Sequence, residues 1–140
     1  MEGFRFVYSQ EVAFGDLDAF GHVNNAVYVR YLENSRIAYM REVLGIESLE
    51  DLFVIVAKVN IDFRTRASLA EALEIGARVS RIGTKSFDLD HEIHGPDGRL
   101  VAAASTTLVT FDYRGDATMP VPDSWRERIE AFEAKDFAAA

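Results

Sequence analysis

One long helical segment among strand-like segments limits most strongly how this sequence can fold. Between Asn25 and Leu44, apolar residues recur at spacings of three and four, beginning with Val27 and Tyr28. This spacing predicts a single helix of about 3.6 residues per turn. Apolar residues continue round its flanks, so we expect the rest of the chain to wrap around it. Asn24 or Asn25 is the expected N-cap, and Gly45 is the expected residue after the last turn.

The other long segments are typical of strands, because apolar and polar residues alternate in them or because they are rich in Val and Ile. They are Phe4–Phe14, Phe53–Phe63, Leu73–Ile82, Ser86–His94 and Leu100–Tyr113. The turn residues Pro96-Asp97-Gly98 join the last two into a hairpin. We expect a short surface helix from Pro122 to Lys135 and a frayed tail at Ala138–Ala140.

A chain of 140 residues fits one domain, spanning residues 1–140. One helix after the first strand, followed by several antiparallel strands, predicts an α+β fold with a curved sheet around a central helix. Such a sheet has open edges, and pairing with a second copy would cover them. We therefore expect a homodimer.

The composition excludes several classes of function. A net charge of -8 argues against nucleic acid as the main partner. The chain has no cysteine, so disulfides, thiolate nucleophiles and cysteine-based zinc sites are excluded. It has neither a signal-peptide pattern nor an apolar run near the ~20 residues that cross a bilayer. We expect a cytoplasmic protein that has no membrane partner.

The loop before the long helix carries the residues best suited to chemistry. It places acidic, imidazole and amide groups next to a helix N-terminus, whose free backbone N–H groups and positive dipole end suit a carbonyl oxygen that gains negative charge. A carboxylate beside such a site can act as a base or a nucleophile. The pattern indicates acyl-transfer chemistry. The loop and the start of the helix read Phe14-Gly-Asp-Leu-Asp-Ala-Phe-Gly-His-Val-Asn-Asn-Ala-Val-Tyr28.

This segment, followed by Tyr31-Leu-Glu-Asn-Ser-Arg36, resembles the hotdog-fold acyl-CoA thioesterases of the 4-hydroxybenzoyl-CoA thioesterase-like group. The string Asp-x-Asp-x-x-Gly-His-Val-Asn-Asn is its most specific part. The resemblance implies a five-stranded antiparallel sheet around the long helix, a dimer that often assembles into a tetramer, and an active site at the dimer interface. It implies an acyl-CoA substrate and neither a cofactor nor a metal.

The resemblance also assigns roles to residues of the loop. Asp18 aligns with the catalytic carboxylate, and the backbone N–H of Asn25 aligns with the donor that polarises the thioester carbonyl. His22 is the third catalytic candidate. Gly21, Val23 and Tyr28 are expected to contact the substrate.

Phosphate contacts are expected from basic residues further along the chain. Lys85 and Ser86 align with a segment that meets the CoA phosphates in the archetype, although Gly83 and Thr84 stand here where two arginines sit. Arg81 lies nearby. Arg64 and Arg66, two residues apart at a strand end, could meet phosphates or an interface carboxylate. The carrier could also be an acyl carrier protein.

Each of these residues also has a structural reading. Asp18 could hold a loop turn, His22 could bind a loop carbonyl, and Tyr28 could be a core residue. Asp16 is expected to be structural, and His91 and His94 are not spaced with His22 as metal ligands. Three functions remain as alternatives: a non-catalytic acyl-CoA or acyl-carrier binding protein, a dimerisation module, and a hydratase acting on an acyl-CoA.

Overall fold

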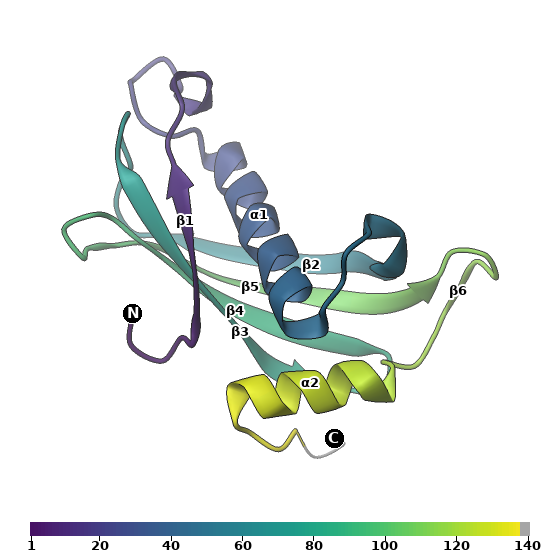
Figure 1. Ribbon diagram of the computed structural model, residues 1–140. Coiled ribbons are helices and arrows are strands. Elements are labelled where there is room, and N and C mark those ends of the chain that lie inside the picture. Colours follow the sequence, from purple (N-terminus) through teal and green to yellow (C-terminus); the bar gives the residue numbers. More distant parts are fainter. Residues whose placement is uncertain (138–140) are drawn as a thin grey trace.

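The computed structural model describes residues 1–137, which form a curved antiparallel sheet with one long helix across its concave face (Figure 1). The strands lie in the order β1-β3-β4-β5-β2, and the two-residue strand β6 pairs with the last two residues of β5. This arrangement confirms the predicted α+β fold with five long strands around one helix. The strands are β1 (Phe6–Glu11), β2 (Val54–Phe63), β3 (Ala72–Ile82), β4 (Ser86–His94), β5 (Leu100–Asp112) and β6 (Ala117–Thr118).

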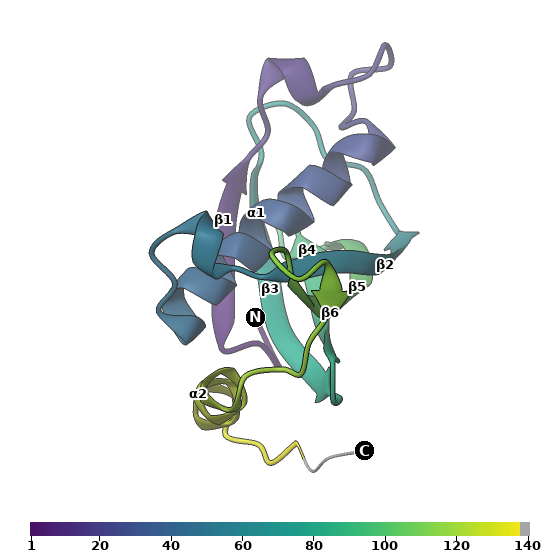
Figure 2. The ribbon, with the colours of Figure 1, turned by 90° about the vertical axis from the view of Figure 1, so that its right-hand side faces the viewer.

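The long helix α1 spans Asn25–Leu44, the bounds that the sequence predicted. Asn24 is its N-cap, because the Asn24 side-chain oxygen accepts a hydrogen bond of 3.0 Å from the Ala26 N–H. Gly45 ends the helix in the left-handed conformation, with φ of 67°. Figure 2 shows α1 lying across the sheet in a view turned by 90°.

Two sequence predictions need correction. The first strand ends at Glu11, whereas we expected it to continue to Phe14. Phe14 instead begins a short 3₁₀ turn and is 80% exposed, so the alternation of apolar residues there does not come from a strand. The second helix, α2 (Asp123–Glu133), is also more than a surface helix, since it buries Trp125 and Ile129. The frayed tail expected at residues 138–140 lies outside the described residues.

The core consists of two clusters beneath the two halves of α1. The first, under the N-terminal half, is formed mainly by Tyr28, Tyr31, Leu32, Leu73, Ile75 and Ile93. The second lies under the C-terminal half, where α2 also contributes, and includes Tyr39, Met40, Phe87, Leu89, Trp125 and Ile129. Burial of these side chains supplies the main force that holds the helix on the sheet.

Helix α2 closes the second cluster. The Trp125 ring stacks on Phe53, with 5.1 Å between the ring centroids. At the end of α2, one carboxylate oxygen of Glu133 accepts hydrogen bonds from the Tyr39 hydroxyl at 2.6 Å and from the Val79 N–H at 3.0 Å. A single carboxylate therefore ties together α1, α2 and β3.

A small polar group is buried between α1 and the sheet. His91 on β4 is 2% exposed, and neither of its ring nitrogens has a hydrogen-bond partner in residues 1–137. The hydroxyls of Ser35 and Thr106 are likewise buried without a partner there. Burial and the nearby Arg36 guanidinium lower the pKa of His91 to about 4. Arg36 also forms an ion pair with Glu33, at 3.8 Å.

Strand β2 forms one edge of the sheet and pairs only with β5 in the described part of the chain. Ile55, Val56 and Phe63 on this strand are between 39% and 46% exposed. An edge with exposed apolar residues is a surface that proteins usually cover. Within residues 1–137, no helix is both long enough and apolar enough to cross a bilayer.

Candidate active site

A cleft of about 470 Å³ opens where the loop before α1 meets the segment after β2. Two backbone contacts join the loop to this segment: the Val23 N–H donates to the Ala67 carbonyl at 3.0 Å, and His22 pairs with Ser68. The cleft therefore lies at the N-terminal end of α1, beside the loop that carries Asp18. Its walls are formed by Asp18, Phe20, His22, Val23, Asn25, Tyr28, Thr65 and Arg66.

Asp18 is exposed and holds its loop in a tight turn. Its Oδ1 accepts hydrogen bonds from the Phe20 N–H at 2.8 Å and from the His22 N–H at 3.3 Å. Gly21 completes the turn with φ of 80°, a conformation that side chains disfavour. The structural contacts considered for Asp18 are thus present. They occupy one oxygen only, since Oδ2 accepts no hydrogen bond from residues 1–137.

The first turn of α1 presents one free backbone donor to the cleft. The Ala26 N–H donates to the Asn24 side chain, and the Val27 N–H donates to the Asn24 carbonyl at 2.8 Å. The N–H of Asn25 has no acceptor within the described residues. The capping pattern therefore leaves a donor at the positive end of the helix dipole, beside the cleft.

Asp16 has the structural place expected for it. It is buried, and its carboxylate accepts hydrogen bonds from the Tyr31 hydroxyl at 2.5 Å, from the Ala13 N–H at 3.0 Å and from Arg30. Burial would raise the pKa of this carboxyl, but the hydrogen bonds from Tyr31 and Ala13 and the charge of Arg30 outweigh it and lower the pKa. The Asp16 carbonyl also accepts from the Asn24 N–H at 2.9 Å, which ties the loop to the helix start.

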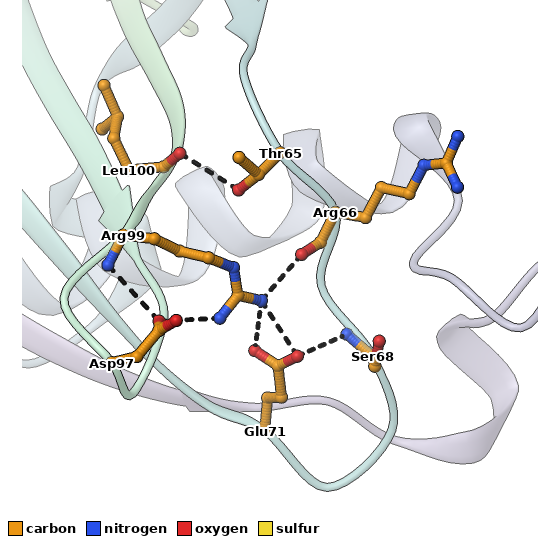
Figure 3. Close-up of polar contacts among 7 residues, drawn as sticks. All are labelled: Thr65, Arg66, Ser68, Glu71, Asp97, Arg99 and Leu100. Atoms are coloured by element: carbon orange, nitrogen blue, oxygen red, sulfur yellow. Dashed lines mark hydrogen bonds and ion pairs between the residues drawn. The ribbon is translucent and has the colours of Figure 1, made fainter.

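The far wall of the cleft is held by an arginine clamp (Figure 3). The Arg99 guanidinium donates to the Glu71 carboxylate at 2.6 Å, to Asp97 at 2.8 Å and to the Arg66 carbonyl at 2.7 Å. The Thr65 hydroxyl donates to the Leu100 carbonyl at 3.1 Å. These contacts fix the backbone of residues 65–71 against the β4–β5 turn.

Comparison with known proteins identifies the family. A family model described as the thioesterase-like superfamily matches residues 12–129. The chain belongs to this family. Over 117 residues it is 29% identical to the long-chain acyl-CoA thioesterase FadM of Escherichia coli (strain K12), a match that covers 81% of this chain and 89% of FadM.

Two solved structures of thioesterases have the same architecture. A thioesterase from Thermus thermophilus, solved with coenzyme A and zinc, is 33% identical, with a TM-score of 0.88 over 96% of this chain and 98% of its own. BH1999, a gentisyl-coenzyme A thioesterase, is 25% identical, with a TM-score of 0.78 over 88% and 98% of the two chains. These similarities confirm the hotdog fold, and with the family match they make this chain a thioester hydrolase by class.

Within this thioesterase-family chain, two of the seven expected substrate contacts line the cleft, one lies beside it in the loop, and four lie outside its walls. Val23 and Tyr28 line the cleft, and Gly21 shapes the loop beside it. The others, Arg64, Arg81, Lys85 and Ser86, are not among the residues that line it.

Arg64 follows β2 directly, two residues before Arg66. Arg81, Lys85 and Ser86 lie around the turn between β3 and β4. There, the Arg81 guanidinium donates to the Asp88 carboxylate at 2.8 Å and to the Ser86 hydroxyl at 2.9 Å. The Lys85 ammonium lies 3.4 Å from the Thr118 hydroxyl. Within one chain, the fold therefore does not bring Arg81, Lys85 and Ser86 together with Asp18.

The cleft is also lined by two residues that no sequence pattern selected. Phe20 is 85% exposed and lines the cleft from the Asp18 loop, and Thr65 lines it from the opposite wall. No spacing signal marks either residue. In residues 1–137, no group of three or more His, Asp or Glu side chains is arranged to hold a metal ion.

Proposed function

We propose that this chain hydrolyses an acyl-CoA thioester to a free acid and CoA, with Asp18 as the reacting carboxylate and the Asn25 N–H as the donor to the carbonyl. One observation carries the proposal. A carboxylate oxygen and a helix N-terminal N–H, neither with a partner in residues 1–137, border the same cleft. The family and its relatives support the reaction class, and this geometry supports the roles of the two residues.

The proposed reaction uses these two groups together. As the thioester carbonyl is attacked, its oxygen gains negative charge and accepts a hydrogen bond from the Asn25 N–H, a contact typically worth ~2.7–4 kcal/mol in the transition state. Asp18 Oδ2 either attacks the carbonyl carbon to form a mixed anhydride, which water then hydrolyses, or takes a proton from the attacking water. In both routes the carbon–sulfur bond breaks and CoA leaves as its thiolate.

The working unit in this proposal is a homodimer, or a tetramer built from dimers. The open edge of β2 and its exposed apolar residues support pairing through this strand. Tyr28 supports a site close to such an interface, because it lines the cleft and its ring centroid lies 5.5 Å from that of Phe63 on β2. The partner chain would then complete the wall of the cleft.

The identity of the acyl group has to be determined by assay, because the relatives are named for different acyl groups. FadM is named for long-chain acyl-CoA, and BH1999 is named for gentisyl-CoA, an aromatic ester. The cleft wall here combines aromatic rings, Phe20 and Tyr28, with polar side chains. A substrate panel should therefore include short, medium, long and aromatic acyl-CoA esters.

The test compares thiol release by the parent, by Asp18→Asn and by Asp51→Asn. Asp51 is an exposed carboxylate away from the cleft and serves as the matched control. We expect kcat to fall by about 10²–10⁴-fold in Asp18→Asn and to stay near the parent value in Asp51→Asn. Light scattering on all three proteins checks that the assembly is unchanged.

The opposite outcomes separate the alternatives. Unchanged turnover in Asp18→Asn would contradict the role of Asp18. Tight binding of acyl-CoA with no turnover in the parent would indicate a binding protein. An enoyl-CoA that loses its conjugated absorbance without thiol release would indicate a hydratase.

A further inference from the structure

The segment that follows β2 carries two arginines whose guanidinium groups have no partner in residues 1–137. Arg66 lines the cleft that holds Asp18, and Arg64 lies two residues before it. Neither guanidinium makes a hydrogen bond or an ion pair with the described residues, although the chain carries a net charge of -8. By contrast, the neighbouring Arg99 guanidinium is engaged by Glu71 and Asp97. An unpaired cation at the mouth of a cleft is available to a ligand.

The backbone beneath these two guanidiniums is fixed. The Arg66 carbonyl accepts the hydrogen bond from Arg99 at 2.7 Å, and the next carbonyl, of Ala67, accepts from the Val23 N–H at 3.0 Å. The N–H of Arg64 donates to the Val101 carbonyl at 2.9 Å. In Figure 3 the Arg66 side chain extends away from Arg99 and Glu71. The clamp thus holds the main chain and leaves the guanidinium free.

A phosphate is the ligand group that suits this arrangement best. Guanidinium groups bind phosphate oxygens through paired, charge-assisted hydrogen bonds, and they are less strongly hydrated than ammonium groups. The net negative charge of the protein would repel a polyanion, so a local pair of positive charges is needed to attract it to the cleft. Arg81 is less suited, because Asp88 already neutralises its charge.

We propose that Arg66, supported by Arg64, binds a phosphate of the carrier to which the acyl group is attached. Arg99 is the positioning residue that holds the Arg66 main chain. This inference rests on the proposed thioesterase function, since it assigns the carrier end of the same cleft. The phosphate on the pantetheine arm is shared by CoA and acyl carrier protein, whereas the adenosine phosphates belong to CoA alone.

The experiment compares four thioesters of one acyl group: acyl-CoA, acyl-phosphopantetheine, acylated acyl carrier protein, and acyl-pantetheine, which has no phosphate. They are assayed with the parent, Arg66→Gln, Arg66→Lys, Arg64→Gln and the control Arg114→Gln, an exposed arginine in the turn before β6. We expect Arg66→Gln to raise KM for acyl-CoA by about tenfold, the scale of one charge-assisted hydrogen bond, with kcat within about twofold of the parent. KM for acyl-pantetheine should not change, and Arg66→Lys should recover part of the loss.

The phosphate-bearing esters identify the source. A KM increase with acyl-CoA, acyl-phosphopantetheine and acyl carrier protein places the contact on the pantetheine phosphate. An increase with acyl-CoA alone places it on the adenosine phosphates. Both results support the proposal. An equal KM increase for acyl-pantetheine, or no increase for any ester, would overturn it.

A second readout does not depend on turnover. Calorimetry of free CoA and of free pantetheine with the same variants should show weaker CoA binding in Arg66→Gln and unchanged pantetheine binding. If the parent hydrolyses no ester but this difference persists, the catalytic proposal fails and the phosphate site stands. If hydrolysis is normal and the difference is absent, the phosphate site fails alone.

Discussion

His91 should make the stability of this protein depend on pH in a range where carboxylates contribute little. The imidazole is buried under α1 without a hydrogen-bond partner in residues 1–137, and the Arg36 guanidinium is close enough to oppose a second positive charge. In the folded chain the ring is therefore neutral down to a pKa of about 4. In the unfolded chain it takes a proton at its ordinary pKa of about 6.5.

The direction and size of the effect follow from proton linkage. Between these two values the unfolded state binds more protons than the folded state, so acidification favours unfolding. The stabilising contribution of neutral His91 is complete above pH 6.5 and is lost as the pH falls toward 4. The full shift from 6.5 to about 4 corresponds to about 3 kcal/mol, of which about 2 kcal/mol should be lost between pH 7.5 and pH 5.

The assay is urea unfolding at several pH values from 7.5 to 5, at one protein concentration so that any dimer contributes equally. His91→Leu keeps a side chain of similar size and removes the titrating ring. Its free energy of unfolding should lose about 2 kcal/mol less than that of the parent over this range. His94→Gln, a more exposed histidine on the same strand, is the matched control and should follow the parent.

The pKa of the ring can also be followed directly by NMR in the folded parent. A titration midpoint near 6.5, or parallel stability curves for the parent and His91→Leu, would refute the reasoning. Either result would mean that the buried imidazole has a partner that supports its charged form. Asp16 and Asp88 do not obscure the test, because their pKa values are lowered and they titrate in more acidic solution.

Two further predictions concern the segments around the cleft. Ala70 has φ of 64°, so Ala70→Gly should relieve strain and raise the free energy of unfolding by up to about 1 kcal/mol in the same urea assay, and a loss would contradict this. Asp16→Asn should lower stability by about 1–3 kcal/mol, because it weakens the contacts with Tyr31 and Ala13. Tyr31→Phe should lose less, and an equal loss in both variants would show that the hydroxyl alone matters.

The sequence predicted both the long helix and its bounds, because the helical spacing of apolar residues begins and ends at the expected capping residues. Asn24 begins the helix through a hydrogen bond with its first turn, and Gly45 ends it in the left-handed conformation. Both effects are local, so the residue types in the sequence indicate them directly. The first strand was predicted too long because alternation continues through Phe14, although that residue is exposed in a 3₁₀ turn. Apolar spacing alone does not distinguish a strand from a turn that projects its aromatic ring.

Only part of the candidate site could be predicted, because only part of it comes from one continuous segment. The loop motif is continuous in the sequence, so it located Asp18 and the start of α1 at once. The opposite wall comes from a segment much later in the chain, around Thr65, and depends on how that segment meets the loop. The pairing of Arg81 with Asp88 depends on a register shift between Val79 and Arg81, which residue spacing does not reveal.

The place of α2 in the chain bears on the order in which the protein can pack during synthesis. The cluster beneath the N-terminal half of α1 draws only on residues up to Ala104, so it can close while the chain is still being made. The other cluster needs Trp125 and the Glu133 contact with Tyr39, and Trp125 and Glu133 leave the ribosome after all the residues of the first cluster. A nascent chain would keep the apolar surface around Phe53 open until then, and this is the stretch that a chaperone would meet. The end of the molecule that holds the cleft can thus become native first.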